Sequence, residues 1–318
     1  MTDDVGAAVD RALAALVGPA AAAMVPASPA RFPDGAAYRI EIPSTEGPAC
    51  LDAVLEEADR LRVPVTRVSQ GSGVCMLTDE ELDRIARSAA DGGVEVSLFA
   101  RPNAGWGRSV SSRSVPGAGL AASAWGTAQL RACLADVARA AAHGFRSVLL
   151  ADVGVLAGFA EMRRASDLPE DMQAKVSVML PAANPPAARV LEDLGAGTLN
   201  VPGDLDAVDL AAIRAAVRIP LDLYVESPDD LGGTVRIDET PELVRVCAPV
   251  HVKLGVRNAP PLYPWGRHLE RVAVDLSRER VRRARLAVEA IERADSGAEA
   301  SVPGAAGLAI PRPTGTGS

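Results

Sequence analysis

An α/β fold, in which eight parallel strands close into a single (β/α)8 barrel, is the fold class that the sequence predicts. Eight short runs rich in β-branched residues alternate with segments of helical pattern across the centre of the chain. Such alternation implies parallel strands. The chain has 318 residues. Because a barrel needs roughly 250 residues, one barrel leaves room for an N-terminal arm and a tail.

An open, doubly wound sheet is the alternative to a closed barrel. Eight strand–helix units favour closure, and no Gly-x-Gly-x-x-Gly pattern follows the first run, as a dinucleotide-binding open sheet would require. We therefore expect a helical arm over residues 1–37, the barrel over 38–294 and a tail over 295–318. The tail contains small residues, Pro and Gly, which predicts disorder.

The boundaries of the elements follow from the residue pattern. The predicted strands are residues 38–42, 65–69, 94–99, 147–152, 175–179, 198–201, 221–226 and 250–254. Between them, helices are predicted at 51–62, after the capping-box pattern of Thr78 to Glu81, and at 127–143, 185–194, 206–217 and 278–293. The connections after the fourth and seventh strands have weaker helical patterns.

The composition is typical of a folded cytoplasmic protein. Apolar residues make up 48% of the chain and charged residues 23%, which excludes disorder for most of it. The net charge of −8 argues against sequence-independent binding of nucleic acid. The four cysteines form no CxxC pair, so we expect free thiols. Neither a membrane-length apolar run nor a basic, secretory type of start is found, so we expect neither a membrane span nor a secretory signal.

Polar residues inside otherwise buried strands are the main functional signal. On the seventh strand Asp222, Tyr224 and Glu226 share one face, because strand side chains alternate. If that face points into the barrel, the carboxylates need partners, since an unpaired buried charge is very costly. Candidate partners from other strands are Arg39, Glu41, Arg67, Lys175 and Lys253. A structural salt-bridge network is the alternative explanation.

The carboxyl ends of barrel strands carry the catalytic groups of such folds. We therefore take Glu226, Lys253 and Asp152 as candidate catalytic residues. Lys253 has two interpretations that stay open. It forms a Schiff base with a carbonyl substrate if burial lowers its pKa, or it holds a carboxylate or phosphate as a fixed cation.

Further residues near the strand ends are candidates for substrate binding. Gln70 lies in the glycine-rich segment 69–73, whose backbone amides suit an anion, and the segment 255–258 follows the eighth strand, where barrels often hold phosphate. The predicted substrate-binding residues are Glu41, Gln70, Arg101, Asn200, Tyr224, Arg257 and Asn258. The Gly- and Ser-rich segment 101–126 leaves the third strand at the same end, as either a lid or an insertion.

A divalent metal is a candidate cofactor. Glu41, Asp152 and Glu226 offer only carboxylate oxygens, which suit Mg²⁺ or Mn²⁺ better than zinc. The chain has three histidines, scattered at His143, His251 and His268, which argues against a His-rich zinc site.

Part of the second half of the chain resembles the U32 peptidase-like barrel family. The resemblance rests on the segments 191–200, 206–213 and 221–226. It implies a barrel, and for some members a role in RNA or quinone hydroxylation with an iron–sulfur cluster. The clustered cysteines that the family has after the seventh strand are absent here, where Ser227-Pro228-Asp229-Asp230 stands, so the pattern argues against a cluster.

Three functional hypotheses follow. The leading one is an enzyme that acts on a small anionic metabolite by lyase or hydrolase chemistry, with Arg257, Lys253 and Arg101 holding its acidic groups. The second is a U32-like protein that modifies a larger substrate. The third is a non-catalytic barrel that binds a ligand or assembles with a partner, including a homo-oligomer.

Overall fold

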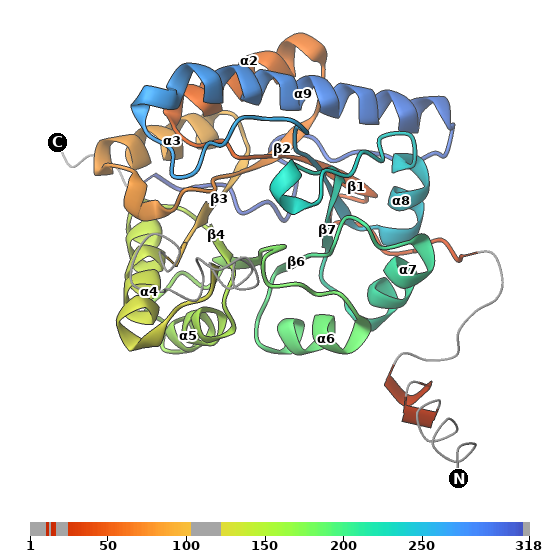
Figure 1. Cartoon of the computed structure of the whole chain (residues 1–318), viewed down its shortest axis with the longest axis horizontal. Coiled ribbons are helices and arrows are strands. Elements are labelled where there is room, and N and C mark those ends of the chain that lie inside the picture. The colour runs from red at the N-terminus through yellow and green to blue at the C-terminus, as the bar shows by residue number, and fades with distance from the viewer. Residues whose placement is uncertain (1–10, 13, 17–24, 103–121, 314–318) are drawn as a thin grey trace.

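The computed structural model of the chain describes residues 11–12, 14–16, 25–102 and 122–313. Eight parallel strands form one closed barrel in sequence order, with the last strand paired to the first. Helices surround the strands (Figure 1). The predicted fold class is therefore confirmed. Of the helical arm predicted over 1–37, the described residues between 11 and 16 are helical, whereas residues 25–37 form turns and irregular backbone, which corrects the prediction there.

The bounds of the strands agree closely with the pattern in the sequence. They are β1 (Tyr38–Pro43), β2 (Val65–Ser69), β3 (Glu95–Phe99), β4 (Ser147–Leu150), β5 (Gln173–Val176), β6 (Thr198–Asn200), β7 (Leu221–Glu226) and β8 (Val250–Leu254). The fifth strand begins two residues earlier than expected. The amide of Gln173 donates to the carbonyl of Arg146 and so extends the ladder with β4.

The helices follow the strands in the expected alternation. They are α2 (Pro48–Leu61), α3 (Asp79–Asp91), α4 (Gly126–Ala142), α5 (Val153–Arg164), α6 (Pro185–Asp193), α7 (Ala207–Ala216), α8 (Thr240–Cys247) and α9 (Glu270–Arg293). The capping box at Thr78 forms as predicted. Helices also follow the fourth and seventh strands, where the pattern was weak.

The last helix is longer than the sequence pattern indicated. α9 begins at Glu270, eight residues before the predicted start at Arg278. Buried positions recur every three or four residues from Ala273 to Ile291, which gives the helix one continuous apolar face. That face packs beside α2 on the outside of the barrel (Figure 1).

The apolar core lies between the strands and the helices. The outward-facing strand residues Ile40, Ile42, Leu98 and Val225 are fully buried there and belong to one large cluster. The inside of the barrel is built differently, from polar residues. None of the described helices is long and apolar enough to cross a bilayer.

The C-terminal segment takes a defined path, in contrast to the disorder expected for 295–318. Residues 299–312 run along the barrel floor, which we define as the amino-terminal ends of the strands. Ser301 donates to Tyr38, Gly304 to Gly93, and Arg312 to Gly144, all through backbone amides at 2.7–2.9 Å. Residues 314–318 lie outside the described residues.

Charged residues at the barrel floor explain why this segment is held. The buried guanidinium of Arg39 donates to Ser301 Oγ at 3.0 Å and to the carbonyl of Ala306 at 2.6 Å. The carboxylate of Glu95 accepts from the amide of Ala309 at 3.2 Å. Composition could not reveal these bonds, because they depend on charges that the folded barrel presents at its floor.

We predict that Ser301→Ala lowers the free energy of unfolding by about 1–3 kcal/mol, because it leaves the buried Nε of Arg39 without its acceptor. Denaturant titration measures the change. Ser296→Ala is the matched control at an exposed position shortly before this segment, with an expected effect within about 0.5 kcal/mol. Equal losses in the two variants would contradict the role given to Ser301.

Candidate active site at the barrel mouth

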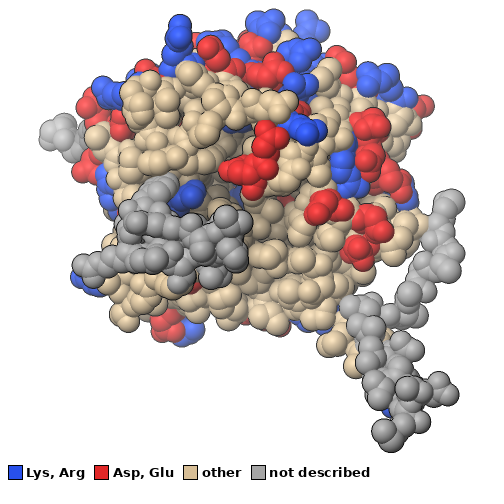
Figure 2. All heavy atoms as spheres, viewed as in Figure 1, with Lys and Arg blue, Asp and Glu red and all other residues tan. Residues whose placement is uncertain are grey.

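A cavity of about 560 Å³ opens at the carboxyl ends of the strands. We call it the mouth cavity. Inward side chains of the strands form its base, including Ser69, Asn200 and Lys253, and the following loops form its wall. Figure 2 shows the hollowed centre of this face, with acidic side chains at its edge. The cavity is large enough for a small metabolite.

Below the mouth cavity, the barrel interior is filled by polar residues. Barrels of this fold usually pack layers of four branched apolar side chains, each layer supplied by alternate strands. Here the strand register and side-chain alternation place one buried layer of Glu41, Ser97, Lys175 and Asp222. The next layer toward the mouth contains Ser69, Leu149, Asn200 and Lys253.

Arg67 lies at the centre of the buried ion network. Its Nε donates to Glu41 Oε2 at 2.8 Å, and its Nη2 donates to both Glu41 and Asp222. The Nη1 atom lies 3.6 Å from Glu95 Oε1. Because each of these residues is buried, the pairing is what makes their charges tolerable. Salt bridging among Arg67, Glu41 and Asp222 therefore confirms the network that the sequence left as an alternative.

Lys175 completes the network from β5. Its Nζ donates to Glu41 Oε1 and lies 3.6 Å from Asp222 Oδ2. Burial would raise the pKa of Glu41, but Arg67, Lys175 and Lys253 together hold it well below its usual value. Burial and the nearby Arg67 lower the pKa of Lys175 to about 7.

Lys253 reaches the base of the mouth cavity from β8 and is 3% exposed. Its Nζ donates to Asn200 Oδ1 at 2.5 Å and lies 4.1 Å from the centre of the Tyr224 ring. Lys253 Nζ also forms an ion pair with Glu41 Oε1, at 3.6 Å. Burial lowers the pKa of Lys253 although Glu41 and Asp222 oppose the shift. The amine is therefore both accessible from the cavity and poorly stabilised as an ammonium.

The choice of lysine at these two positions is informative. The chain contains 33 basic residues, of which 31 are arginines and two, Lys175 and Lys253, are lysines. Both lysines are buried inside the barrel. Arginine stays charged in proteins, whereas a buried lysine can lose its proton. This imbalance is a signal in the sequence that points directly at the two amines.

Arg101 forms part of the cavity wall. Its guanidinium donates to the carbonyl of Gly71 at 3.0 Å and stands near the rings of Phe99 and Tyr263. Burial lowers its pKa. Gln70 also lines the cavity, where its side-chain amide closes a turn with both backbone groups of Gly73. Five predicted site residues thus line one cavity: Gln70, Arg101, Asn200, Tyr224 and Lys253.

The backbone amides of the segment 69–73 already bind an anion from this chain. Gly71 and Ser72 donate to the buried carboxylate of Glu46 at 2.8 and 3.0 Å. A side chain at Gly71 would collide with the ring of Tyr263, since its Cβ would lie 2.5 Å from that ring. The expected ligand-binding role of these amides is therefore taken by an internal contact that shapes the cavity wall.

Glu226 does not point into the barrel as the alternation from Asp222 and Tyr224 suggested. The pairing of β7 with β8 shifts register between Tyr224 and Glu226, which interrupts the alternation. Its Oε1 accepts from the amide of Arg257 at 3.0 Å, and its Oε2 lies 3.5 Å from Arg283 Nε on α9. Glu226 therefore faces the outer helix and does not line the mouth cavity.

Three other predicted residues have structural contacts away from the cavity. Asp152 caps α5 by accepting from Val155 at 3.0 Å, and its second oxygen accepts from Ala124. Arg257 is exposed and lies 3.5 Å from Asp229, which also accepts from the amide of Asn258. Asp152, Arg257 and Asn258 are thus turn and cap residues. The sequence placed them near strand ends correctly but could not show the direction of their side chains.

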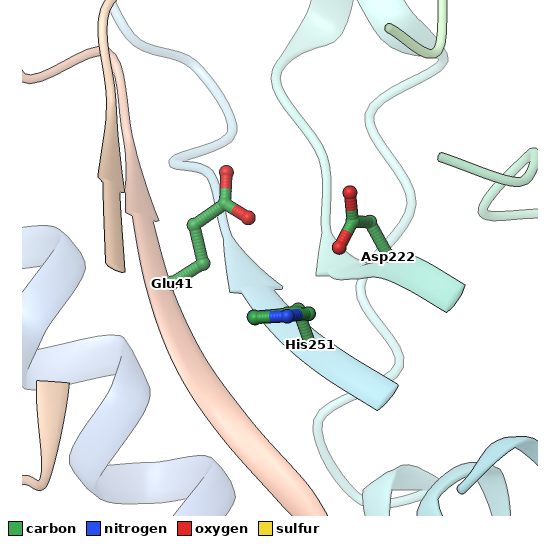
Figure 3. A group of neighbouring side chains, drawn as sticks. All are labelled: Glu41, Asp222 and His251. Atoms are coloured by element: carbon green, nitrogen blue, oxygen red, sulfur yellow. The ribbon is translucent and has the colours of Figure 1, made fainter. Parts of the chain in front are cut away.

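The predicted metal ligands have separate surroundings. Glu41 lies in the ion network, Asp152 caps α5 and Glu226 faces α9. A different set, Glu41, Asp222 and His251, has ligand atoms within 4.8 Å of one another, with the two carboxylates turned toward each other (Figure 3). Arg67 donates to both carboxylates and Lys175 to one of them. This set therefore fits an internal ion network better than a metal site.

The segment 101–126, the cysteines and Tyr263 complete the comparison with the sequence. The segment 101–126 was expected to form a lid or an insertion, and residues 103–121 of it lie outside the described residues. All four cysteines have free thiols, as expected; Cys75 is exposed and the other three are buried. Tyr263, which no sequence pattern indicated as a site residue, shares a hydrogen bond through its hydroxyl with Ser44 at the cavity wall.

Comparisons with known proteins yield distant similarities only. No protein-family model matches the chain, and no curated protein matches it. Among solved structures, the YdjI aldolase from Escherichia coli K12 is 15% identical over 82% of this chain and 92% of that chain, with a TM-score of 0.46. A U32 peptidase is 20% identical over 63% of this chain and 73% of that chain, with a TM-score of 0.40. These similarities assign neither a family nor an activity.

We predict that Arg67→Met lowers the free energy of unfolding by about 3–5 kcal/mol, because it leaves Glu41 and Asp222 as uncompensated buried charges. Arg84→Met is the matched control, since Arg84 pairs with Asp52 at the surface, where such a pair is worth about 0–1 kcal/mol. Urea titration of both variants measures the difference. A loss no larger for Arg67→Met than for the control would refute the central role of Arg67.

Proposed function

We propose that this chain is an enzyme of lyase type that acts on a small carbonyl compound carrying an anionic group. In this proposal Lys253 is the amine nucleophile and Arg101 binds the anionic group. The observation that carries the proposal is the placement of Lys253: a buried amine with a lowered pKa lies at the base of a metabolite-sized cavity. Desolvated lysines of this kind are activated for attack on carbonyl groups.

The chemistry requires little from the surrounding residues. The neutral amine of Lys253 adds to the substrate carbonyl, and loss of water leaves an iminium ion. When the bond between the α and β carbons of the iminium breaks, its electron pair moves into the iminium and forms an enamine, and the β fragment leaves as an aldehyde whose hydroxyl proton passes to water. Protonation of the enamine and hydrolysis then release the product and restore Lys253. The polar network below the cavity supports these changes of charge in a site removed from bulk water.

Residues around Lys253 fit the stages of this reaction. Asn200 Oδ1 accepts from the amine and orients it. The face of the Tyr224 ring, 4.1 Å from Nζ, favours a positive charge at that nitrogen. Arg101, held beside Phe99 and Tyr263, supplies a cation at the wall for a carboxylate or phosphate group.

We predict that a carbonyl compound is trapped on Lys253 by reduction. Incubation with pyruvate, glyoxylate or dihydroxyacetone phosphate and sodium cyanoborohydride should add the reduced carbonyl mass to the peptide that contains Lys253. Because the chain has two lysines, peptide mass spectrometry separates this site from Lys175 and the terminal amine. Lys253→Met should abolish the adduct. If none of the three compounds gives an adduct at Lys253, the lyase proposal is rejected. Lys253 would then be a fixed cation, or the barrel a ligand-binding protein.

We predict that Arg101→Gln weakens trapping of anionic carbonyl compounds selectively. The pyruvate concentration for half-maximal labelling of Lys253 should rise about tenfold, the cost of one charge-assisted contact of roughly 1.4 kcal/mol. Labelling by neutral dihydroxyacetone should change little. Arg257→Gln is the matched control, because Arg257 is exposed and outside the cavity. Equal effects of Arg101→Gln on both compounds would contradict an anion-binding role.

A further inference from the structure

The two lysines of the chain approach the same carboxylate oxygen. Lys175 Nζ donates to Glu41 Oε1, and Lys253 Nζ lies 3.6 Å from that atom. We propose that Lys175 is a positioning residue for Lys253: by occupying Glu41 Oε1, it denies Lys253 a full carboxylate partner and keeps its amine available to react. This inference rests on the proposed function, in which Lys253 is the nucleophile.

Lys175 contacts the carboxylate of Glu41 more closely than Lys253 does. Lys175 lies between two carboxylates, with Asp222 Oδ2 3.6 Å from its Nζ. Ser69 Oγ also donates to Glu41 Oε1, at 2.7 Å, so this oxygen already has two close donors. Lys253 donates to the amide oxygen of Asn200 and faces the ring of Tyr224, while Glu41 Oε1 lies farther away, at 3.6 Å. A neutral amide stabilises an ammonium less than a carboxylate does.

The position of Lys175 separates its role from that of Lys253. Lys253 lines the mouth cavity, whereas Lys175 is 1% exposed and lies among the charges beneath it. Lys175 therefore influences the reaction through Glu41 and through its own charge, without touching a substrate. While Lys175 holds its proton, both effects act in one direction, since a nearby cation and the loss of an anionic partner each favour the neutral form of Lys253.

Other titratable groups around Lys253 also influence its pKa. Glu41 and Asp222 favour its ammonium form, and Arg67 opposes that form. Tyr224 faces the amine with its ring, and burial raises the pKa of its hydroxyl, so it stays neutral. His251 lies on the same strand, and burial holds its pKa well below the usual value, so it too is neutral near pH 7. None of these residues is substituted in Lys175→Met.

The test compares two variants that should move Lys253 in opposite directions. Lys175→Met frees Glu41 Oε1 for Lys253 and removes a cation, so the amine should hold its proton to higher pH. Glu41→Gln removes the anion itself, so the amine should lose its proton at lower pH. The readout is the rate of reductive methylation of Lys253 by formaldehyde and sodium cyanoborohydride as a function of pH, followed by peptide mass spectrometry.

We expect the pH midpoint of labelling to rise by about one unit in Lys175→Met, which makes labelling about tenfold slower at a fixed pH below the midpoint. In Glu41→Gln the midpoint should fall. Circular dichroism checks that each variant is folded. If Lys175→Met does not fold, Lys175→Gln, which keeps a donor for Glu41 but removes the charge, should shift the midpoint upward by a smaller amount. A purely structural role would slow labelling or shift the midpoint in the same direction in both variants, and that result would overturn the proposal.

Formaldehyde labelling needs no natural substrate, so the two hypotheses can fail separately. Opposite shifts without any trapped pyruvate, glyoxylate or dihydroxyacetone phosphate would support the role of Lys175 and reject the lyase. Trapping at Lys253 with an unchanged midpoint in Lys175→Met would support the lyase and reject the role of Lys175.

Discussion

The contact of Arg67 with Glu41 and Asp222 inside the barrel is the interaction on which the rest of the structure depends. It joins β2 to its neighbour β1 and, across the interior, to β7. With few apolar side chains in this space, the barrel is held together internally by ion pairs whose members are all buried. Such pairs stabilise a fold only if nearly every partner is satisfied. The same requirement fixes the side chains around them, including the two lysines.

This constraint links stability to function. Glu41 already pairs closely with Arg67 and Lys175, so its carboxylate stabilises the ammonium form of Lys253 only weakly. Lys253 lies one layer nearer the mouth cavity. The pairing of charges inside the barrel therefore favours the neutral amine of Lys253 that the proposed reaction needs. At the barrel floor, the backbone of the C-terminal segment 299–312 supplies hydrogen-bond partners to two further charged residues, Arg39 and Glu95.

The fold could be predicted from the sequence because strand–helix alternation is a local pattern repeated eight times. The site could be predicted only in part. Alternation correctly turned Asp222, Tyr224 and Lys253 inward, and five predicted residues line the mouth cavity. It failed at Glu226, where a register shift in the pairing with β8 redirects the side chain. The residues that cap turns and helices, Asp152 and Asn258 among them, could not be told from site residues because their partners are set by loop geometry.

The most direct test of this account is the titration of the two lysine side chains. Labelling with ¹⁵N-lysine yields two Nζ signals, which NMR follows as the pH is raised in the protein without any ligand. The buried charge network predicts that Lys175 titrates near pH 7 and that Lys253 titrates below the ordinary value of 10.5. Two signals that both titrate near 10.5, as exposed lysines do, would contradict it.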